Sequence, residues 1–333
     1  MVFLHFLLIL AAPREGVYAR FFDIDAISRK VRATTRSWQP YSYPWLDSLD
    51  SAEIKRNYLG VRDDAVQDVN HSGDHTADHF LSTNSSFDWR NTNQSVCIGP
   101  VKVFAWIMDS LLRHNAYPRN PRTPVYLSIY LFPTRSKDQG KCGSCWAEST
   151  VESLADRRCI RSNTGQRLAL SALDVIACDK LCEGIEKCCR GCTGGYPKLA
   201  FKFFEHTGVV SEACMPYNLT RSLLCPLPKC KKPLDDTAYR AKHTKQVLGG
   251  APSMQKEIAT FGPIVATFTV FEDFMTYRSG IYKYSGVGKR LGLHAVKVHT
   301  YRHNMHVRLY FSPPFESTSR HLAHHSTRDS FFG

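Results

Sequence analysis

The sequence lacks any hydrophobic run that is long enough to cross a membrane as an ordinary helix. Its N-terminal apolar run, residues 1–12, is too short for that purpose. Small residues follow this run, and Val17-Tyr-Ala19 offers a cleavage point, a combination that is typical of a signal peptide. We therefore expect residues 1–19 to direct the chain into the secretory pathway. The alternative is a buried N-terminal helix.

Acidic residues are scarce, because 30 Asp and Glu face 43 Lys and Arg, which gives a formal charge of +13. Such an excess would suit a protein that binds nucleic acid or an anionic surface. The basic residues are scattered, however, and the sequence contains no basic helix and no basic strip interleaved with aromatic residues. We therefore expect no nucleic-acid partner.

The 12 cysteines of the sequence fit an oxidising compartment, where disulfides form and persist. Acceptor patterns for N-glycosylation add mild support for secretion because such triplets are common by chance. They begin at Asn70, Asn84, Asn93 and Asn218.

The most informative motif is Gln139-Gly-Lys-Cys-Gly-Ser-Cys145-Trp-Ala. Residues 146–154 have helical spacing, which places Cys145 at the start of a helix. The unpaired N–H groups and the dipole of a helix N-terminus lower the pKa of a thiol and so favour its nucleophilic form. Gly140 and Gly143 allow tight turns that would bring a backbone amide and the Gln139 side chain toward one oxyanion. The motif therefore predicts a nucleophilic cysteine.

This motif closely resembles the signature around the nucleophile of the papain family of cysteine peptidases. The resemblance covers most of residues 20–297 and is strongest to cathepsin B-like enzymes. It implies a propeptide over residues 20–83, which covers the cleft, and a peptidase domain over residues 84–297. The implied fold is α+β and has two lobes, a helical left lobe and a β-barrel-like right lobe, with the active-site cleft between them. A helix-rich first half and a strand-rich second half of the domain agree with two lobes.

The resemblance also implies the roles of individual residues. Cys145 is the expected nucleophile, and His294 is the expected base in a thiolate–imidazolium pair that forms an acyl-enzyme. The Gln139 side chain is the expected oxyanion donor. Gly194 and Gly195 would let a substrate strand lie against the backbone without a side-chain clash.

By position, the cathepsin B framework implies four disulfides. Cys182, Cys188 and Cys189 then leave an odd thiol whose pairing the sequence does not settle. A zinc site built from Cys178, Cys182, Cys188 and Cys192 is an alternative on spacing, but a secreted protein favours disulfides, and we expect neither a metal nor a cofactor. The expected bonds are Cys97–Cys159, Cys142–Cys192, Cys178–Cys230 and Cys214–Cys225.

The chain departs from the family pattern in two segments. Residues 102–134 form an atypical insertion, and residues 298–333 form a tail in which the family's C-terminal strands and its Asn-Ser-Trp run are missing. A valine, whose codons begin with the bases of a splice donor, opens each departure. We therefore favour unspliced intron sequence in a gene model over a genuine insertion and tail. The histidines between 299 and 325 are interpreted as part of this tail and not as a metal site.

Between these departures, the pattern predicts a helix opened by Ser171, a helix over residues 198–206 and a strand over residues 264–270. The 224–230 region lacks the paired histidines with which cathepsin B captures a C-terminal carboxylate, so the resemblance favours endopeptidase action. We expect a monomeric, extracellular or lysosomal (vacuolar) zymogen that acts on proteins and peptides and is inhibited by its own propeptide. The alternative is a catalytically impaired, disulfide-rich binding protein or an incomplete gene-model product, because the asparagine that orients the imidazole is missing.

Overall fold

The computed structural model describes residues 23–63, 86–99, 139–219, 223–226, 228, 230, 238–248, 250–280, 282–302 and 331–332. The expected signal peptide and the insertion at 102–134 lie outside these residues. Helices of the described part are all too short or too polar to cross a membrane.

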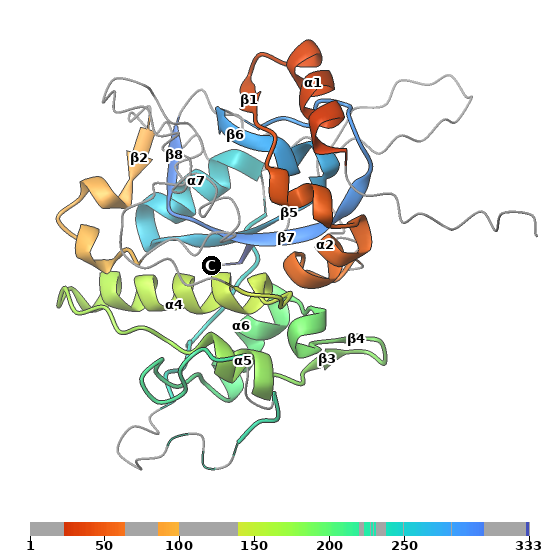
Figure 1. Ribbon diagram of the computed structural model, residues 1–333. Coiled ribbons are helices and arrows are strands. Elements are labelled where there is room, and N and C mark those ends of the chain that lie inside the picture. Colours follow the sequence, from red (N-terminus) through yellow and green to blue (C-terminus); the bar gives the residue numbers. More distant parts are fainter. Residues whose placement is uncertain are drawn as a thin grey trace, which may run out of the picture.

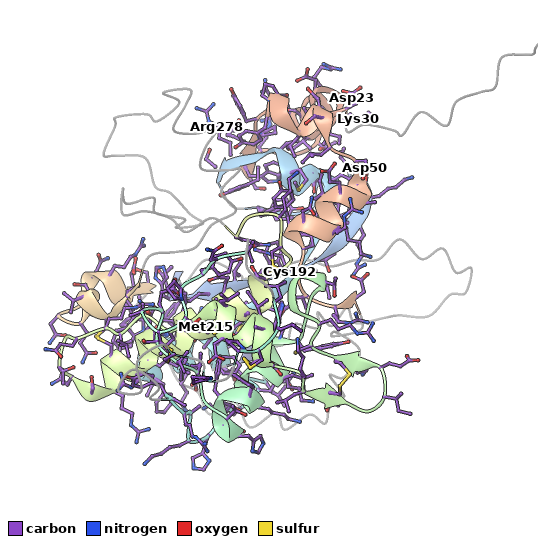
Figure 2. The ribbon with its side chains drawn as sticks, turned by 60° about the horizontal axis from the view of Figure 1, so that its bottom comes forward. Asp23, Lys30, Asp50, Cys192, Met215 and Arg278 are labelled. Atoms are coloured by element: carbon purple, nitrogen blue, oxygen red, sulfur yellow. A yellow bond between two sulfur atoms is a disulfide. The ribbon has the colours of Figure 1, made fainter. Side chains whose placement is uncertain are left out.

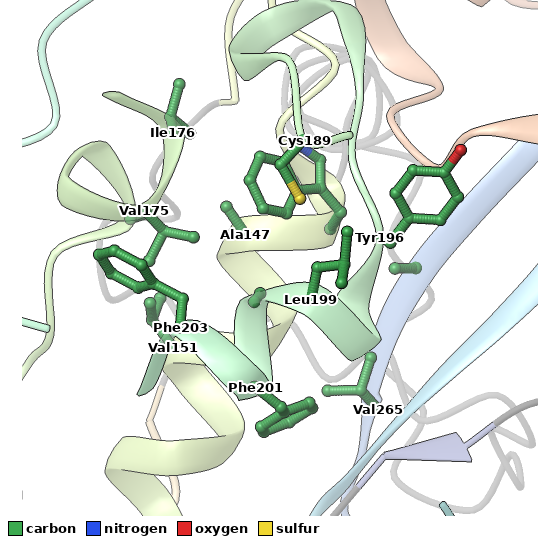
Figure 3. Packing of buried hydrophobic residues seen from close by; sticks show 14 of the residues in the cluster. Ala147, Val151, Val175, Ile176, Cys189, Tyr196, Leu199, Phe201, Phe203 and Val265 are labelled. Atoms are coloured by element: carbon green, nitrogen blue, oxygen red, sulfur yellow. The ribbon is translucent and has the colours of Figure 1, made fainter. Parts of the chain in front are cut away.

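One layer of the molecule is helical and consists of α4 (Cys145–Ser162), α5 (Ala172–Cys178) and α6 (Pro197–His206). Ser171 caps α5, as expected, because its hydroxyl accepts a hydrogen bond from the Asp174 N–H at 3.0 Å. The three helices share one core, in which Trp146 and Phe204 are completely buried. Figure 3 shows that Val265 from the neighbouring sheet reaches the same cluster.

The second layer is a three-stranded sheet of order β7-β5-β9. In it, β5 (Ile264–Phe271) pairs antiparallel with β7 (Arg290–Val298) and, through its start, with β9 (Phe331–Phe332). Helix α7 (Gly250–Phe261) precedes β5, and α4 lies along β7 (Figure 1). The described residues thus form the expected α+β fold of two layers, although their strands make open sheets and no closed barrel.

The N-terminal part of the chain packs where β5 ends and β7 begins (Figure 1). It contains α1 (Ile24–Thr34), β1 (Trp38–Pro40) and α2 (Ser51–Tyr58), and β1 pairs with β6 (Tyr277–Gly280). Aspartates open both helices, at Asp23 and Asp50 (Figure 2), because their carboxylates accept backbone N–H groups of the first turn. The remaining short elements are η1 (Pro44–Ser48), η3 (Trp89–Asn91), η4 (Ser95–Cys97), β3 (Cys182–Glu183), β4 (Lys187–Cys188), η5 (Gly191–Thr193) and η7 (Glu272–Thr276).

The boundary expected after Lys297 falls inside the folded part of the chain. Strand β7 continues to Val298, and β8 (Thr300–Arg302) pairs with β2 (Ser86–Asp88). Tyr301 is 3 % exposed and stacks on Phe87, and His299 is buried beside Asp88. The strand at 300–302 thus belongs to the folded part of the chain, because Tyr301 completes a buried aromatic cluster with Phe87 and Trp89.

Five disulfides lie in the described part of the chain. Cys97–Cys159 and Cys142–Cys192 are the expected pairs, whereas the other two expected pairs exchange partners and become Cys178–Cys225 and Cys214–Cys230. Position in the sequence did not separate these alternatives, so the approach of the Cα atoms, 4.7 Å and 5.0 Å, decides the pairing. Cys182–Cys188 is the fifth bond, which leaves Cys189 and Cys145 as the free thiols among the described residues. The four cysteines of the zinc alternative are all in disulfides.

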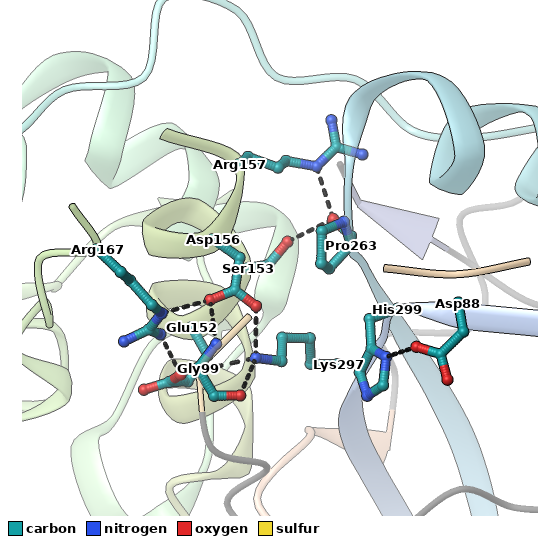
Figure 4. Close-up of polar contacts among 10 residues, drawn as sticks. All are labelled: Asp88, Gly99, Glu152, Ser153, Asp156, Arg157, Arg167, Pro263, Lys297 and His299. Atoms are coloured by element: carbon teal, nitrogen blue, oxygen red, sulfur yellow. Dashed lines mark hydrogen bonds and ion pairs between the residues drawn. The ribbon is translucent and has the colours of Figure 1, made fainter. Parts of the chain in front are cut away.

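A buried ionic cluster joins α4 to β7 (Figure 4). The Lys297 ammonium of β7 lies 2.6 Å from Asp156 and 3.7 Å from Glu152, and both carboxylates also pair with Arg167. Lys297 is 4 % exposed and Asp156 is completely buried. Because two cations face two carboxylates, the charges balance, and the Gly99 N–H and C=O complete the hydrogen bonds.

We predict that Lys297→Met lowers the free energy of unfolding by about 3 kcal/mol, because it leaves a buried carboxylate without its ammonium partner. Urea unfolding at neutral pH with the disulfides intact measures this loss. Lys198→Met is the matched control, because it removes an exposed pair with Glu183 whose loss should cost less than about 1 kcal/mol. Equal losses in the two variants would contradict the prediction.

Candidate active site

Cys145 is the first residue of α4, and two features fix the loop before it. The Cys142–Cys192 disulfide, which is near the centre of Figure 2, ties this loop to the glycine-rich turn at 191–195. Beside the disulfide, the Gly143 N–H donates to the Cys192 carbonyl at 2.9 Å. The helix N-terminus therefore holds the thiol in one place, with the orphan N–H groups of the first turn around it.

The Cys145 thiol is buried and carries a backbone contact from the N-terminal segment. The Gly60 N–H donates to Cys145 Sγ at 3.2 Å, across 85 residues of sequence. Burial raises the pKa of the thiol to about 11, although the N–H groups of Ala295 and Gly60 favour the thiolate. In this state the cysteine is a neutral thiol at physiological pH, and the lowered pKa expected from its helix position is not realised.

His294 lies in the middle of β7, directly before Ala295. Its ring packs edge-on against Phe268, with the ring centroids 5.7 Å apart, and the residue is 6 % exposed. Burial lowers the pKa of the imidazole to about 3. Since the Ala295 N–H acts on the Cys145 sulfur, the fold brings the start of α4 and the middle of β7 together, with both candidate groups neutral.

The Gln139 side chain is also buried beside Cys145. Its Nε2 group donates to the carbonyls of Tyr58, at 3.2 Å, and of Cys142, at 2.6 Å. Its own backbone carbonyl accepts the Tyr217 hydroxyl at 2.8 Å. The expected oxyanion donor therefore already binds two peptide carbonyls. The Tyr58 carbonyl belongs to the N-terminal segment, and the Cys142 carbonyl belongs to the nucleophile loop.

Gly194 and Gly195 face the same segment. The Gly195 N–H donates to the Gly60 carbonyl at 2.9 Å, and the Gly195 carbonyl accepts the Arg62 N–H at 3.2 Å. Gly194 has φ of +109°, and a Cβ atom there would lie 2.9 Å from the Gly60 carbonyl oxygen. Glycine at 194 thus permits the close approach of another main chain, here that of the N-terminal segment.

Residues 60–62 therefore lie between the glycine-rich turn and β7, and the space that they fill is called the cleft below. One wall is Gly195, and the other is β7, where the Leu293 carbonyl accepts the Val61 N–H at 3.4 Å. Sequence reasoning assigned residues 20–83 to a covering segment but missed that Gly60 is the residue at the sulfur. A Cβ at Gly60 would lie 2.1 Å from the Gly143 carbonyl oxygen, so this position requires glycine. The glycine itself is the one signal in the sequence that could have indicated this contact.

Comparison with known proteins agrees with this geometry. The sequence profile described as "Papain family cysteine protease" matches residues 132–312, which is more than half of the chain. The chain belongs to the papain family of cysteine proteases. The matched range includes the nucleophile motif, β7 and the strand β8 that extends the fold beyond Lys297.

Several curated relatives of this papain-family chain are named as cathepsin B-like. "Cathepsin B-like cysteine proteinase 1" of Ostertagia ostertagi is 37 % identical over an aligned length of 190, and the match covers 48 % of this chain and 53 % of the relative. "Cathepsin B-like protease 1" of Arabidopsis thaliana is 39 % identical over an aligned length of 173, and the match covers 48 % of this chain and 44 % of the relative. The chain thus spans about half the length of the curated relatives it matches.

Solved structures show the same fold with its N-terminal segment. The structure titled "proCathepsin B S9 from Trypanosoma congolense" has a TM-score of 0.52 at 24 % identity, and the match covers 83 % of this chain and 81 % of that one. The proform of the ragweed pollen allergen Amb a 11 has a TM-score of 0.54 at 20 % identity, with 84 % and 73 % covered. The described fold is therefore that of a papain-like proprotein.

We predict that Gly60→Ala uncovers the Cys145 thiol, because the added methyl group cannot fit against the Gly143 backbone. The rate at which a pyridyl disulfide labels Cys145 in the full chain, read by mass spectrometry, should rise at least tenfold. Ser51→Ala, an exposed change in the same segment, should leave the rate unaltered. A slow rate in Gly60→Ala would show that this contact does not protect the thiol.

We also predict that acid opens the cleft through His294. Below pH 6.5 an exposed imidazole binds a proton that the buried one binds only near pH 3. Each pH unit between these values therefore disfavours the closed state by about 1.4 kcal/mol. Cys145 labelling, corrected for the reagent's own pH dependence, should accelerate as the pH falls from 6.5 to 4.

The matched control for this titration is His294→Phe, which keeps an apolar ring against Phe268 and removes the titrating group. Its labelling rate should lose this part of the pH dependence. An unchanged acid response in His294→Phe would assign the opening to other groups.

Proposed function

We propose that the chain is the precursor of a cysteine-type endopeptidase, which hydrolyses peptide bonds through Cys145 and His294. The observation that carries this proposal is the contact at the Cys145 sulfur. A helix N-terminus, the strand that bears His294 and a peptide main chain all meet there. A peptide already lies in the cleft with hydrogen bonds on both sides, which supports a main-chain binding site for protein and peptide substrates.

Activation begins when residues 58–62 leave the cleft. Water then returns to both groups, and the effect of burial on the two pKa values is relieved. The Cys145 proton moves to the imidazole, and the helix N-terminus stabilises the thiolate that remains. The N-terminal segment acts as the inhibitor because it occupies the cleft and places the Gly60 N–H against the Cys145 sulfur.

The chemistry then follows from the positions of the three side chains. Cys145 Sγ attacks the substrate carbonyl carbon, and the protonated His294 gives its proton to the leaving amine, which forms the acyl-enzyme. Water hydrolyses this thioester with His294 as the base. Gln139 Nε2, which binds the Tyr58 carbonyl in the closed state, and the Cys145 N–H stabilise the oxyanion.

We further propose that the protein functions in the secretory pathway, outside the cell or in a lysosome or vacuole. The five disulfides support an oxidising compartment. Endopeptidase action is favoured because the short segment from Leu224 to Cys230 carries no histidine pair.

The second candidate is a catalytically impaired, peptide-binding protein. One observation favours it: no Asn-Ser-Trp run follows His294 in the sequence. A missing partner for the imidazole lowers the fraction of productively oriented His294 and therefore the turnover rate, without removing the cleft.

A thiol-directed peptidyl epoxide should label Cys145 in the acid-opened protein, because the cleft binds its peptide and the activated sulfur opens its ring. Cys145→Ala should abolish labelling, whereas Cys189→Ala, which removes the other free thiol in the described residues, should not change it. Cleavage of an internal bond in a blocked peptide should follow the same pattern. Peptide binding without labelling or cleavage would favour the second candidate.

A further inference from the structure

The cleft contains a cation whose role the proposed mechanism does not use. Beyond Gly60, the N-terminal segment runs antiparallel to the start of β7 and reaches Asp63. Arg290 Nη2 lies 3.0 Å from Asp63 Oδ1, and Lys55 Nζ lies 2.6 Å from Asp63 Oδ2. One carboxylate is thus held between a cation of its own segment and a cation of the cleft wall.

Arg290 remains in the cleft when the segment leaves, because it is the first residue of β7. Lys55 and Asp63 both belong to the expected propeptide and leave together on activation. Arg290 then loses its carboxylate partner. In the described part of the chain, Arg290 forms its ion pair with Asp63. Both side chains of this pair are 42 % exposed, so an incoming peptide can reach the guanidinium.

The backbone beside Arg290 is shaped for a bound peptide. A Cβ atom at Gly292 would lie 3.0 Å from a methyl group of Leu59 and 3.9 Å from Asp63 Oδ1, so glycine leaves room for the segment. Asp63 is three residues from Gly60, whose N–H contacts the Cys145 sulfur. The carboxylate therefore marks a fixed position along the cleft relative to the nucleophile.

We propose, on the basis of the endopeptidase function above, that Arg290 is a specificity-determining residue that binds a carboxylate of the substrate. The favoured ligand is a peptide with Asp or Glu about three residues from the residue at Cys145 Sγ. A guanidinium suits this role because its N–H groups match the geometry of a carboxylate. A chain-end carboxylate at the same position has the same chemistry. The pair is half exposed, so the preference is about two- to fivefold.

The first test is a double-mutant cycle in the full chain, with Asp63→Asn, Arg290→Gln and both changes together. The rate of Cys145 labelling by a pyridyl disulfide reports how firmly the segment is held, with no need for catalysis. Each single change should raise the rate two- to fivefold, and the double variant should be no faster than the faster single variant. Lys289→Gln, the exposed neighbour, is the matched control and should not change the rate.

The second test measures substrate choice by the same full-length proteins after acid opening. Reporter peptides carry Asp, Asn or Glu at successive positions with an amidated end, and one Asn peptide has a free chain end. The wild type should cleave one Asp peptide two- to fivefold faster than its Asn counterpart, and Arg290→Gln should remove this preference. Faster cleavage of the free-end peptide would identify the chain end as the source of the carboxylate.

The outcomes separate the two proposals. Cleavage without any acid preference, or with a preference that Arg290→Gln retains, overturns the role of Arg290 and leaves the endopeptidase standing. No cleavage of any peptide overturns the endopeptidase, and a retained coupling between positions 63 and 290 then restricts Arg290 to holding the N-terminal segment. If the rate increase of the double variant equals the product of the two single increases, positions 63 and 290 act independently. That result overturns the contact between Asp63 and Arg290.

Discussion

The packing of α4 against β7 is the contact on which the rest of this structure depends. At one end of the interface, Cys145 Sγ meets the backbone of Ala295, and at the other end, Lys297 reaches Asp156. Asp156 lies about 16 Å further along the helix than Cys145. Two points of attachment so far apart fix both the position and the direction of the strand on the helix. The candidate nucleophile and the candidate base therefore belong to one rigid interface, although they are far apart in sequence.

In the described state, both candidate groups at this interface are neutral. A cleft that is filled by residues 60–62 excludes water, and low local polarity disfavours both the thiolate and the imidazolium. A helix N-terminus alone would lower the pKa of Cys145, but here desolvation is the larger effect. Burial thus decides the protonation state of both candidate groups in the described state.

The N-terminal segment is held in the cleft by ordinary peptide contacts. Its main chain binds Gly195 on one wall and Leu293 on the other, and its Tyr58 carbonyl takes up the Gln139 amide. Because these are groups that any peptide possesses, the occupied cleft also indicates how a substrate would be held. The contact between Asp63 and Arg290 is different, since it involves a particular side chain. It is therefore the contact on which the proposed preference for an acidic substrate residue rests.

Local signals in the sequence predicted much of the fold and part of the site. The helix after Ser171, the strand over 264–270 and the helix that begins at Cys145 follow from capping residues and hydrophobic periodicity, which act over a few residues. Two disulfides were also predicted, from resemblance. The short strand at 300–302 was not predicted, because the burial of Tyr301 and His299 depends on β2, which lies far earlier in the chain.

By itself, the sequence determined which residues are nucleophile, base and oxyanion donor candidates and where the helix that presents Cys145 begins. The tertiary structure alone decided which cysteines pair across the Cys178–Cys230 region, which glycine reaches the sulfur and in which protonation state the thiol and imidazole are held. The physical reason is that pairing and pKa values depend on distance and burial. Both are set by contacts between segments that are remote in sequence, such as Gly60 with Cys145, and no local pattern encodes them.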